Sequence, residues 1–314
     1  MDTTGYFPRE EWKGLVGTEA PEAEKYTNEL YGALAEEGYT VGPGNSGMRD
    51  CELPVGEQWM YHAVADTILA NNILRSDPRI DSGKIGICGI SWGSVITSIA
   101  IGYDNRYAFA IPIYGSAYLD VPSAPELPLV FREEPVKSLW SAADRLSNAH
   151  FPIHWLCWSS DTCFFAQANS LSYETTKDDG AYLSIRYDFS HGHAGGWLTP
   201  ESYRFAEKTL EGKLPFIRPI TEPEGTGKIS FRISVPEDFM HTEATILYLT
   251  EPPQFGEENG MQKMLTKWVF VPAQIQGDVV TGTVPENVYC YYVQLRGMAD
   301  GQWQVSSTRM NVLG

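Results

Sequence analysis

Residues 89–93, with the sequence GISWG, could place a nucleophile for acyl transfer. They match the pattern G-x-S-x-G, and they lie between the apolar run 85–88 and an apolar stretch with helical spacing at 94–101. In this context the pattern predicts a sharp turn from strand to helix, which holds the serine hydroxyl above a sheet. A negative charge that develops there is favoured by the start of the helix. We therefore predict Ser91 as the nucleophile, and the alternative is a glycine-rich turn without chemistry.

A serine nucleophile at neutral pH needs a general base, and the base needs an acid that orients it. In chains with this turn the three residues follow in the order serine, acid, histidine. The apolar run 153–158 predicts a strand, and Asp161 follows it closely. We predict Asp161 as the acid, with a helix-capping aspartate as the alternative reading. Asp120, which follows an earlier strand, is the second candidate.

The base is predicted just beyond the strand-like run 183–189. His191 lies at the exit of this strand, and His193 is the competing candidate two residues later. A metal site at this His-Gly-His pair would need a third ligand at a zinc-like spacing, and the sequence offers none. We therefore predict His191 as the base and expect neither a metal nor a cofactor. The backbone N–H of Trp92 is the expected first donor to an oxyanion.

Alternating strands and helices predict the scaffold of the first two thirds of the chain. Apolar residues at four-residue spacing favour a helix over 58–75, and short apolar runs favour strands between the helices. This alternation is typical of a mostly parallel α/β sheet. The expected strands are 85–88, 108–113, 153–158 and 182–189, and the further helices are 94–101, 164–173 and 199–210.

The chain changes its pattern at a join with two prolines, residues 212–219. Beyond it, short runs alternate apolar and polar residues, as strands with one buried face do. We predict an α/β domain over 1–214 and a β-sandwich of immunoglobulin or fibronectin type over 215–314. The expected strands of the sandwich are 229–235, 245–250, 267–271, 278–283, 289–295 and 302–307.

Four stretches resemble the acetyl xylan esterase and cephalosporin-C deacetylase branch of the α/β-hydrolases. They are residues 77–86 with the following turn, 161–163, 185–191 and 5–6. The resemblance implies a serine esterase that cleaves a small acyl group, such as acetyl, from a carbohydrate or another small molecule. It also implies that the N–H of Tyr6 is the second oxyanion donor. The usual residue after the family's serine is glutamine, whereas this chain has Trp92.

The N-terminal region departs from the family pattern because no strands precede Tyr6. Residues 19–37 have helical spacing instead, so we expect the sheet to begin at Tyr39, without the family's first strands. The exposed sheet edge should then be covered by residues 1–18, by the β-sandwich or by a second copy in a homo-oligomer.

The charge and the cysteine content of the chain bear on which partners and which cellular location are expected. The formal net charge of −17 disfavours nucleic acid and anionic membranes. The chain has no apolar run of about 18 residues and no secretory leader. Five cysteines without a C-x-x-C pair favour a reducing, cytoplasmic location. Two functions remain as alternatives to an esterase, namely a serine peptidase of prolyl-oligopeptidase type and a non-catalytic binding protein with a hydrolase fold.

Overall fold

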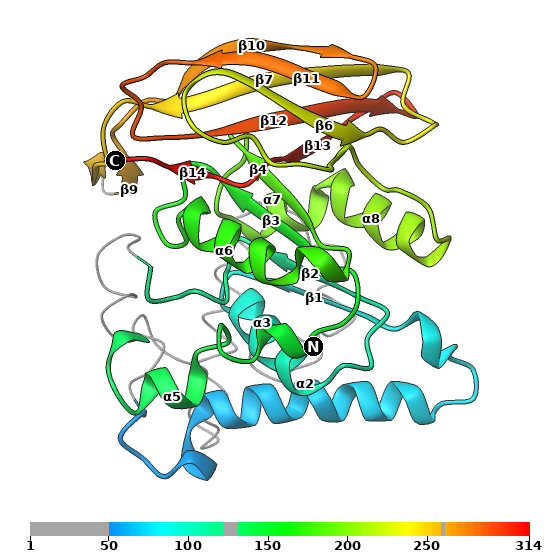
Figure 1. Cartoon of the computed structure of the whole chain (residues 1–314). Coiled ribbons are helices and arrows are strands. Elements are labelled where there is room, and N and C mark those ends of the chain that lie inside the picture. Colours follow the sequence, from blue (N-terminus) through cyan, green and yellow to red (C-terminus); the bar gives the residue numbers. More distant parts are fainter. Residues whose placement is uncertain (1–49, 122–130, 259–260) are drawn as a thin grey trace.

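The computed structural model describes residues 50–121, 131–258 and 261–314 (Figure 1). The predictions for Tyr6, for a helix over 19–37 and for a sheet that begins at Tyr39 lie outside the described residues. The helices are α2 (Trp59–Ser76), α3 (Trp92–Tyr103), α5 (Val136–Trp140), α6 (Ala166–Thr176), α7 (His193–Leu198) and α8 (Pro200–Leu210), with short 3-10 helices at Val55–Glu57, Ser82–Lys84, Leu146–Asn148 and Lys177–Asp179.

A four-stranded parallel sheet forms the centre of the first part. Its strands, in spatial order, are β1 (Gly86–Ile90), β2 (Phe109–Ile113), β3 (His154–Trp158) and β4 (Tyr182–Arg186). Residues of β2 and β3 are buried on both faces, as parallel strands with helices on both sides should be. The predicted mostly parallel α/β sheet is therefore confirmed.

Two apolar clusters cover the two faces of this sheet. On one face, α3 and α6 contribute to the large cluster, and α2 packs against α3 through Met60 and Val64. Their four-residue spacing places both side chains on one side of α2, as predicted. On the other face, Phe205 of α8 packs against Ile90 and Ile111.

The remaining strands form an antiparallel β-sandwich above the parallel part (Figure 1). The path of paired strands is β13-β12-β7-β10-β11-β6-β5, with β14 beside β12. Strand β10 joins the two layers, because its residues 269–273 pair with β7 and its residues 274–276 pair with β11. The bounds are β5 (Arg218–Pro219), β6 (Gly227–Ser234), β7 (His241–Leu249), β8 (Phe255–Glu258), β9 (Met261–Met264), β10 (Val269–Gln276), β11 (Val279–Val284), β12 (Cys290–Ala299), β13 (Gln302–Ser307) and β14 (Asn311–Val312).

The sandwich has its own apolar centre and also packs on the parallel part. Phe231 of β6, Ile246 of β7 and Val293 of β12 belong to a cluster between its layers. The next residues along these two strands, Leu247 and Tyr292, face the other way. They belong to the large cluster of the parallel part. The predicted all-β second part is confirmed, while its boundary at residue 215 stays a prediction.

Side chains of the sandwich satisfy the free edge of β4. The backbone N–H of Ile185 donates to Ser307 Oγ at 3.0 Å, and its carbonyl accepts from Gln294 Nε2 at 3.3 Å. The Ser184 hydroxyl donates to the Val305 carbonyl at 2.6 Å. An edge strand that is paired in this way offers no free backbone groups at these positions to another chain.

A partly buried carboxyl group lies at the same junction. Glu222 accepts from the Tyr173 hydroxyl at 3.2 Å and from the backbone N–H of Arg309 at 3.1 Å. Burial raises the pKa of Glu222 to about 7, and the neighbouring carboxylate of Glu174 acts in the same direction.

Several local predictions need correction. Helix α6 begins at Ala166, two residues later than predicted, and the six-residue helix α7 and the hairpin β8–β9 were not predicted. The apolar run that contains Cys88 favours a buried side chain, but Cys88 is exposed, because β1 is an outer strand among the described strands and α8 packs over β2.

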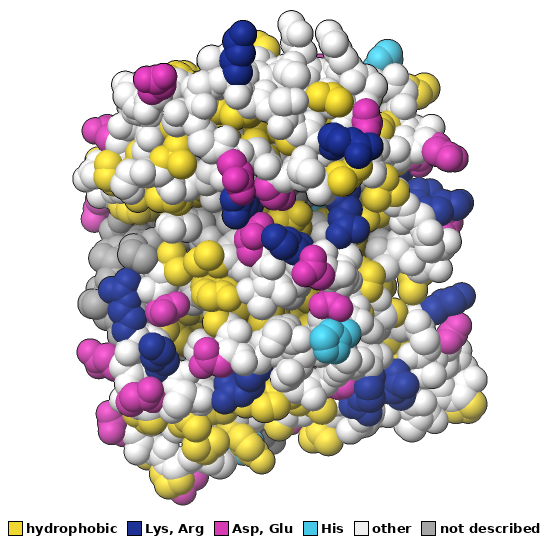
Figure 2. Space-filling view, viewed as in Figure 1, with side chains coloured by type: hydrophobic (Ala, Val, Ile, Leu, Met, Phe, Trp, Pro, Cys, Tyr) yellow, Lys and Arg dark blue, Asp and Glu magenta, His cyan; other side chains and the backbone are white. Residues whose placement is uncertain are grey.

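The sequence predicts no membrane-spanning segment and an acidic surface, and both expectations concern residues that the structure describes. None of its helices is both long and apolar enough to cross a bilayer. Figure 2 shows basic and acidic side chains interspersed over the face in view. On that face, therefore, neither sign of charge dominates.

Candidate active site

The turn between β1 and α3 has the backbone of a nucleophile elbow. Ser91 has φ 55° and ψ −118°, a left-handed conformation that a residue with a side chain rarely adopts. Its N–H donates to the Ile113 carbonyl at 3.0 Å, and its carbonyl accepts from Ser94 at 2.8 Å and Val95 at 3.1 Å. These bonds hold the strained residue between the sheet and the start of the helix.

The small residues of the motif are required by the packing of the turn. A Cβ atom on Gly89 would lie 2.1 Å from the carbonyl oxygen of Gly93. Gly115, which follows β2, is similarly crowded, because its Cβ atom would lie 2.5 Å from Cβ of Ser94. The strand and the helix can approach this closely only because these positions carry no side chain.

Asp161 lies in the turn that follows β3, where it is completely buried. Its Oδ1 accepts from the backbone N–H groups of Cys163 at 2.7 Å and Phe164 at 2.9 Å. Its Oδ2 lies 2.9 Å from His191 Nδ1. One oxygen therefore fixes the carboxylate to the chain, and the other faces the histidine.

His191 follows β4 and bridges the acid and the serine. Its Nε2 lies 2.8 Å from Ser91 Oγ, and its side chain is 25% exposed. A carboxylate at Nδ1 can only accept a hydrogen bond, so Nδ1 carries the proton and Nε2 is free to accept one from the serine. The structure thus brings Ser91, Asp161 and His191 into one hydrogen-bonded chain, which is the geometry that the sequence predicts.

Two aromatic residues hold the imidazole from its sides. The ring of Tyr114 lies 4.6 Å from the His191 ring, and Phe164 stacks on it at 6.0 Å. The Tyr114 hydroxyl donates to the Gly192 carbonyl, directly after the histidine. Tyr114 itself has φ 32°, a second strained residue at the end of a strand. Sequence reasoning missed this role, for which the only signal was an aromatic residue after a buried strand.

The second candidates are not part of this arrangement. Asp120 lies in a turn, where its carbonyl accepts from Arg132 Nε at 2.8 Å. The side chain of His193 lies outside the described part of the structure. His154 of β3 is fully buried, with Nε2 at 2.8 Å from Ser184 Oγ. Burial lowers the pKa of His154 to about 3, so this ring stays neutral near pH 7.

Of the two predicted oxyanion donors, Trp92 belongs to the described part of the structure. The N–H of Trp92, as the first residue of α3, has no partner within its own helix. It is therefore available beside Ser91. Tyr6 lies outside the described residues. The Trp92 ring packs beside the buried ring of Phe131, with the two ring centres 6.3 Å apart.

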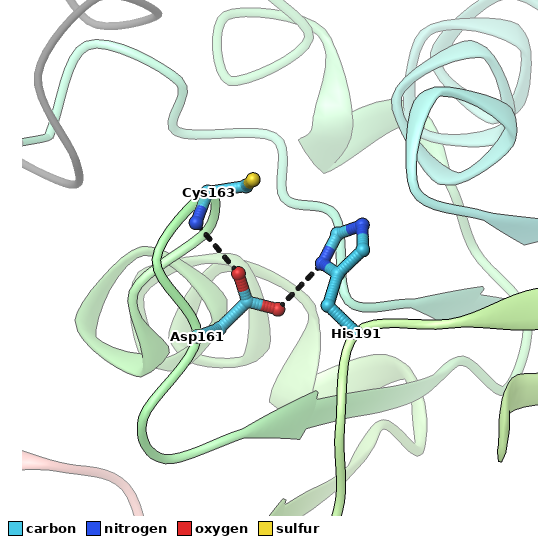
Figure 3. A group of neighbouring side chains, drawn as sticks. All are labelled: Asp161, Cys163 and His191. Carbon is cyan, nitrogen blue, oxygen red and sulfur yellow. Dashed lines mark hydrogen bonds and ion pairs between the residues drawn. The ribbon is translucent and has the colours of Figure 1, made fainter. Parts of the chain in front are cut away.

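Cys163 adds a thiol to the acid and the base. Each of Asp161, Cys163 and His191 offers a ligand atom, and these atoms all lie within 4.8 Å of one another (Figure 3). Burial raises the pKa of the Cys163 thiol, and the nearby Asp161 charge adds to the effect. The thiol takes no part in the chain of hydrogen bonds from Ser91 to Asp161.

The order of these features along the sheet is that of an α/β-hydrolase. A nucleophile elbow follows β1, an acid follows β3 and a histidine follows β4. The described part of the chain therefore has the predicted fold of an α/β-hydrolase. No family model matches the chain, and no curated protein matches it.

Solved structures share part of the fold at low similarity. The acylaminoacyl peptidase of Pyrococcus horikoshii is 20% identical over 48% of this chain and 28% of its own, with a TM-score of 0.41. The acetyl xylan esterase 1 of Thermoanaerobacterium sp. is 14% identical over 55% of this chain and 60% of its own, with a TM-score of 0.40. A puromycin-hydrolyzing peptidase of Mycobacterium tuberculosis is 18% identical over 47% of this chain and 25% of its own, with a TM-score of 0.39.

The chain thus spans 25% to 60% of the length of these three proteins. Similarity at this level carries no argument about substrate.

Proposed function

We propose that the chain is a serine hydrolase that cleaves carboxylic esters. The observation that carries this proposal is the hydrogen-bonded chain from Ser91 Oγ through His191 to the buried Asp161, with distances of 2.8 Å and 2.9 Å. A serine in an elbow with a base and an orienting acid is equipped for acyl transfer.

The proposed reaction proceeds in two steps. His191 Nε2 accepts the Ser91 proton as Oγ attacks the ester carbonyl, and the imidazolium then gives this proton to the leaving alcohol. Water attacks the resulting acyl-serine with His191 again as the base. Asp161 stabilises the imidazolium in both steps, because its Oδ2 accepts a hydrogen bond from Nδ1. The Trp92 N–H supports the oxyanion, and Tyr6 stays the predicted second donor.

A small acyl group on a carbohydrate or another small molecule remains the predicted substrate class. This part rests on the resemblance of residues 77–93, 161–163 and 185–191 to the acetyl xylan esterase branch.

Hydrolysis of p-nitrophenyl acetate, with a peptide p-nitroanilide in parallel, tests the proposal. The ester should be cleaved by the wild-type chain. Ser91→Ala should lose several orders of magnitude in kcat and all labelling by a fluorophosphonate, since no other described group replaces the nucleophile. Ser138→Ala, at an exposed serine far along the chain, is the control and should behave as the wild type.

Each other outcome rejects the proposal in a distinct way. Cleavage of the peptide substrate in preference to the ester would assign a peptidase. Failure of the wild-type chain to cleave either substrate or to react with the fluorophosphonate would assign a non-catalytic protein. Labelling that persists in Ser91→Ala would place the nucleophile elsewhere.

A further inference from the structure

The side chains of Asp161, Cys163 and His191 combine the three ligand types that zinc prefers. Zn²⁺ binds carboxylate oxygen, thiolate sulfur and imidazole nitrogen, and it often keeps a fourth position for water. The three ligand atoms lie within 4.8 Å of one another (Figure 3). We propose that these residues form an inhibitory Zn²⁺ site that captures the acid and the base of the hydrolase.

The separation of the ligand atoms is close to that of a zinc site. Bond lengths of about 2.0–2.3 Å in a tetrahedral site place ligand atoms about 3.3–3.8 Å apart. The separation of His191 Nδ1 and Asp161 Oδ2, 2.9 Å, is about 0.4 Å below this range, and no separation exceeds the range by more than about 1 Å. Rotation of the Cys163 side chain about its single free torsion can close such a gap.

The local backbone holds the carboxylate in a suitable orientation. Oδ1 of Asp161 accepts from the N–H groups of Cys163 and Phe164, so Oδ2 is left to face His191 and the cation. Hydrogen bonds of this kind orient metal ligands and raise their affinity. The thiol is only partly buried and the His191 side chain is 25% exposed, so a cation can reach both.

Metal binding at this place removes the general base. Nδ1 is the ring nitrogen that faces Asp161, at 2.9 Å from Oδ2. A cation on Nδ1 takes the electron pair of this nitrogen, so the ring proton moves to Nε2. Nε2 then donates toward Ser91 and cannot accept the serine proton. The Cys163 thiol proton is released to solvent as the thiolate binds the cation.

Inhibition by this route rests on the proposed hydrolase function, whereas the binding of the metal does not. The two are therefore measured separately on the full chain. Competition with a chromophoric chelator measures Zn²⁺ binding, and fluorophosphonate labelling together with ester hydrolysis measures the state of Ser91. Mg²⁺ serves as the control cation, because a hard cation has little affinity for a thiolate and imidazole pair.

Cys163→Ser is the test variant, and Cys51→Ser is its matched control. We expect one Zn²⁺ per wild-type chain, together with loss of labelling and hydrolysis that excess chelator reverses. Cys163→Ser should bind Zn²⁺ at least about tenfold more weakly, and it should stay reactive at Zn²⁺ concentrations that silence the wild type. Cys51→Ser should behave as the wild type.

The proposal and the hydrolase function can fail independently. A chain that binds Zn²⁺ through Cys163 but never hydrolyses an ester would retain the metal site and reject the function. Equal Zn²⁺ affinity, or equal inhibition, in the wild type and Cys163→Ser would reject the metal site. If Cys163→Ser does not fold, Cd²⁺ gives a second readout in the wild type, where the absence of a cadmium–thiolate charge-transfer band would overturn the proposal.

Discussion

Replacement of Asp161 by asparagine should reverse the direction of the hydrogen bonds through the base. Oδ1 of the native residue accepts from two backbone N–H groups, and Oδ2 accepts from His191 Nδ1. Asparagine offers one oxygen and one NH₂ group. If its oxygen keeps the two backbone donors, its NH₂ group faces Nδ1, and the imidazole must then carry its proton on Nε2.

The cost of unpaired N–H groups favours the orientation in which the asparagine oxygen keeps the two backbone donors. The opposite orientation would leave the buried N–H of Phe164 and the partly buried N–H of Cys163 without an acceptor, at about 1–3 kcal/mol for each. A total of about 2–6 kcal/mol corresponds to a preference of about 30-fold or more, since about 1.4 kcal/mol is a factor of ten. The His191 Nε2 proton then points at Ser91 Oγ, 2.8 Å away in the native chain, and the serine loses its base. The same exchange in serine proteases lowers kcat by about 10⁴-fold.

Steady-state hydrolysis of p-nitrophenyl acetate by Asp161→Asn measures this loss, and ¹⁵N NMR of the imidazole reports the tautomer. We expect a loss of about 10⁴-fold in kcat with the proton found on Nε2. Asp120→Asn is the matched control and should keep the native rate. A rate for Asp161→Asn within tenfold of the native one, or a native tautomer in an inactive variant, would refute the reasoning.

Three further predictions concern the supports of the site and the junction. Gly89→Ala should lower the free energy of unfolding, measured by urea titration, by about 1–3 kcal/mol, because the new Cβ would lie 2.1 Å from the Gly93 carbonyl oxygen. A variant as stable as the native chain would contradict the tight turn. Tyr114→Phe removes the hydroxyl that anchors the loop after the base, so kcat should fall roughly 10- to 100-fold with little change in KM, whereas a change confined to KM would argue against a positioning role. The pKa of Glu222 is raised from 4.5 to about 7, so the folded chain holds a proton that the unfolded chain has lost, and this group lowers stability as the pH rises through that window. The free energy of unfolding of Glu222→Gln, relative to that of the native chain, should therefore increase from pH 4.5 to about 7 and stay constant below and above this window. Urea unfolding measures this difference, and a difference that does not change with pH would exclude the raised pKa.

The sequence predicts the parts of the site that depend on local pattern. Ser91, Asp161 and His191 each follow an apolar run that forms a parallel strand, and the carboxyl ends of such strands meet at one edge of a sheet. Strand and helix positions in both parts of the chain follow from the same periodicities. Residue type and distance from a strand end left Asp120 and His193 as competing candidates, and it is the contacts of the folded chain that bring Ser91, Asp161 and His191 together.

Features that depend on contacts between distant segments could not be predicted in this way. Cys163 lies beside His191 only because β3 and β4 are neighbours, and Tyr114 reaches the base across the sheet from β2. Cys88 resembles a core residue within its apolar run, but its burial depends on which strand lies outermost. The helix α7 is short and rich in glycine, so it has no apolar face that a pattern could detect.

The hydrogen bonds between β4 and the sandwich affect how the chain unfolds. The loop that carries His191 leaves the strand whose edge is held by Ser307 and Gln294, both from strands of the sandwich. The apolar cluster of the parallel part continues into Leu247 and Tyr292 of the sandwich. Melting of the sandwich would expose that cluster and release the strand beside the base. The two parts should therefore melt together as one cooperative unit.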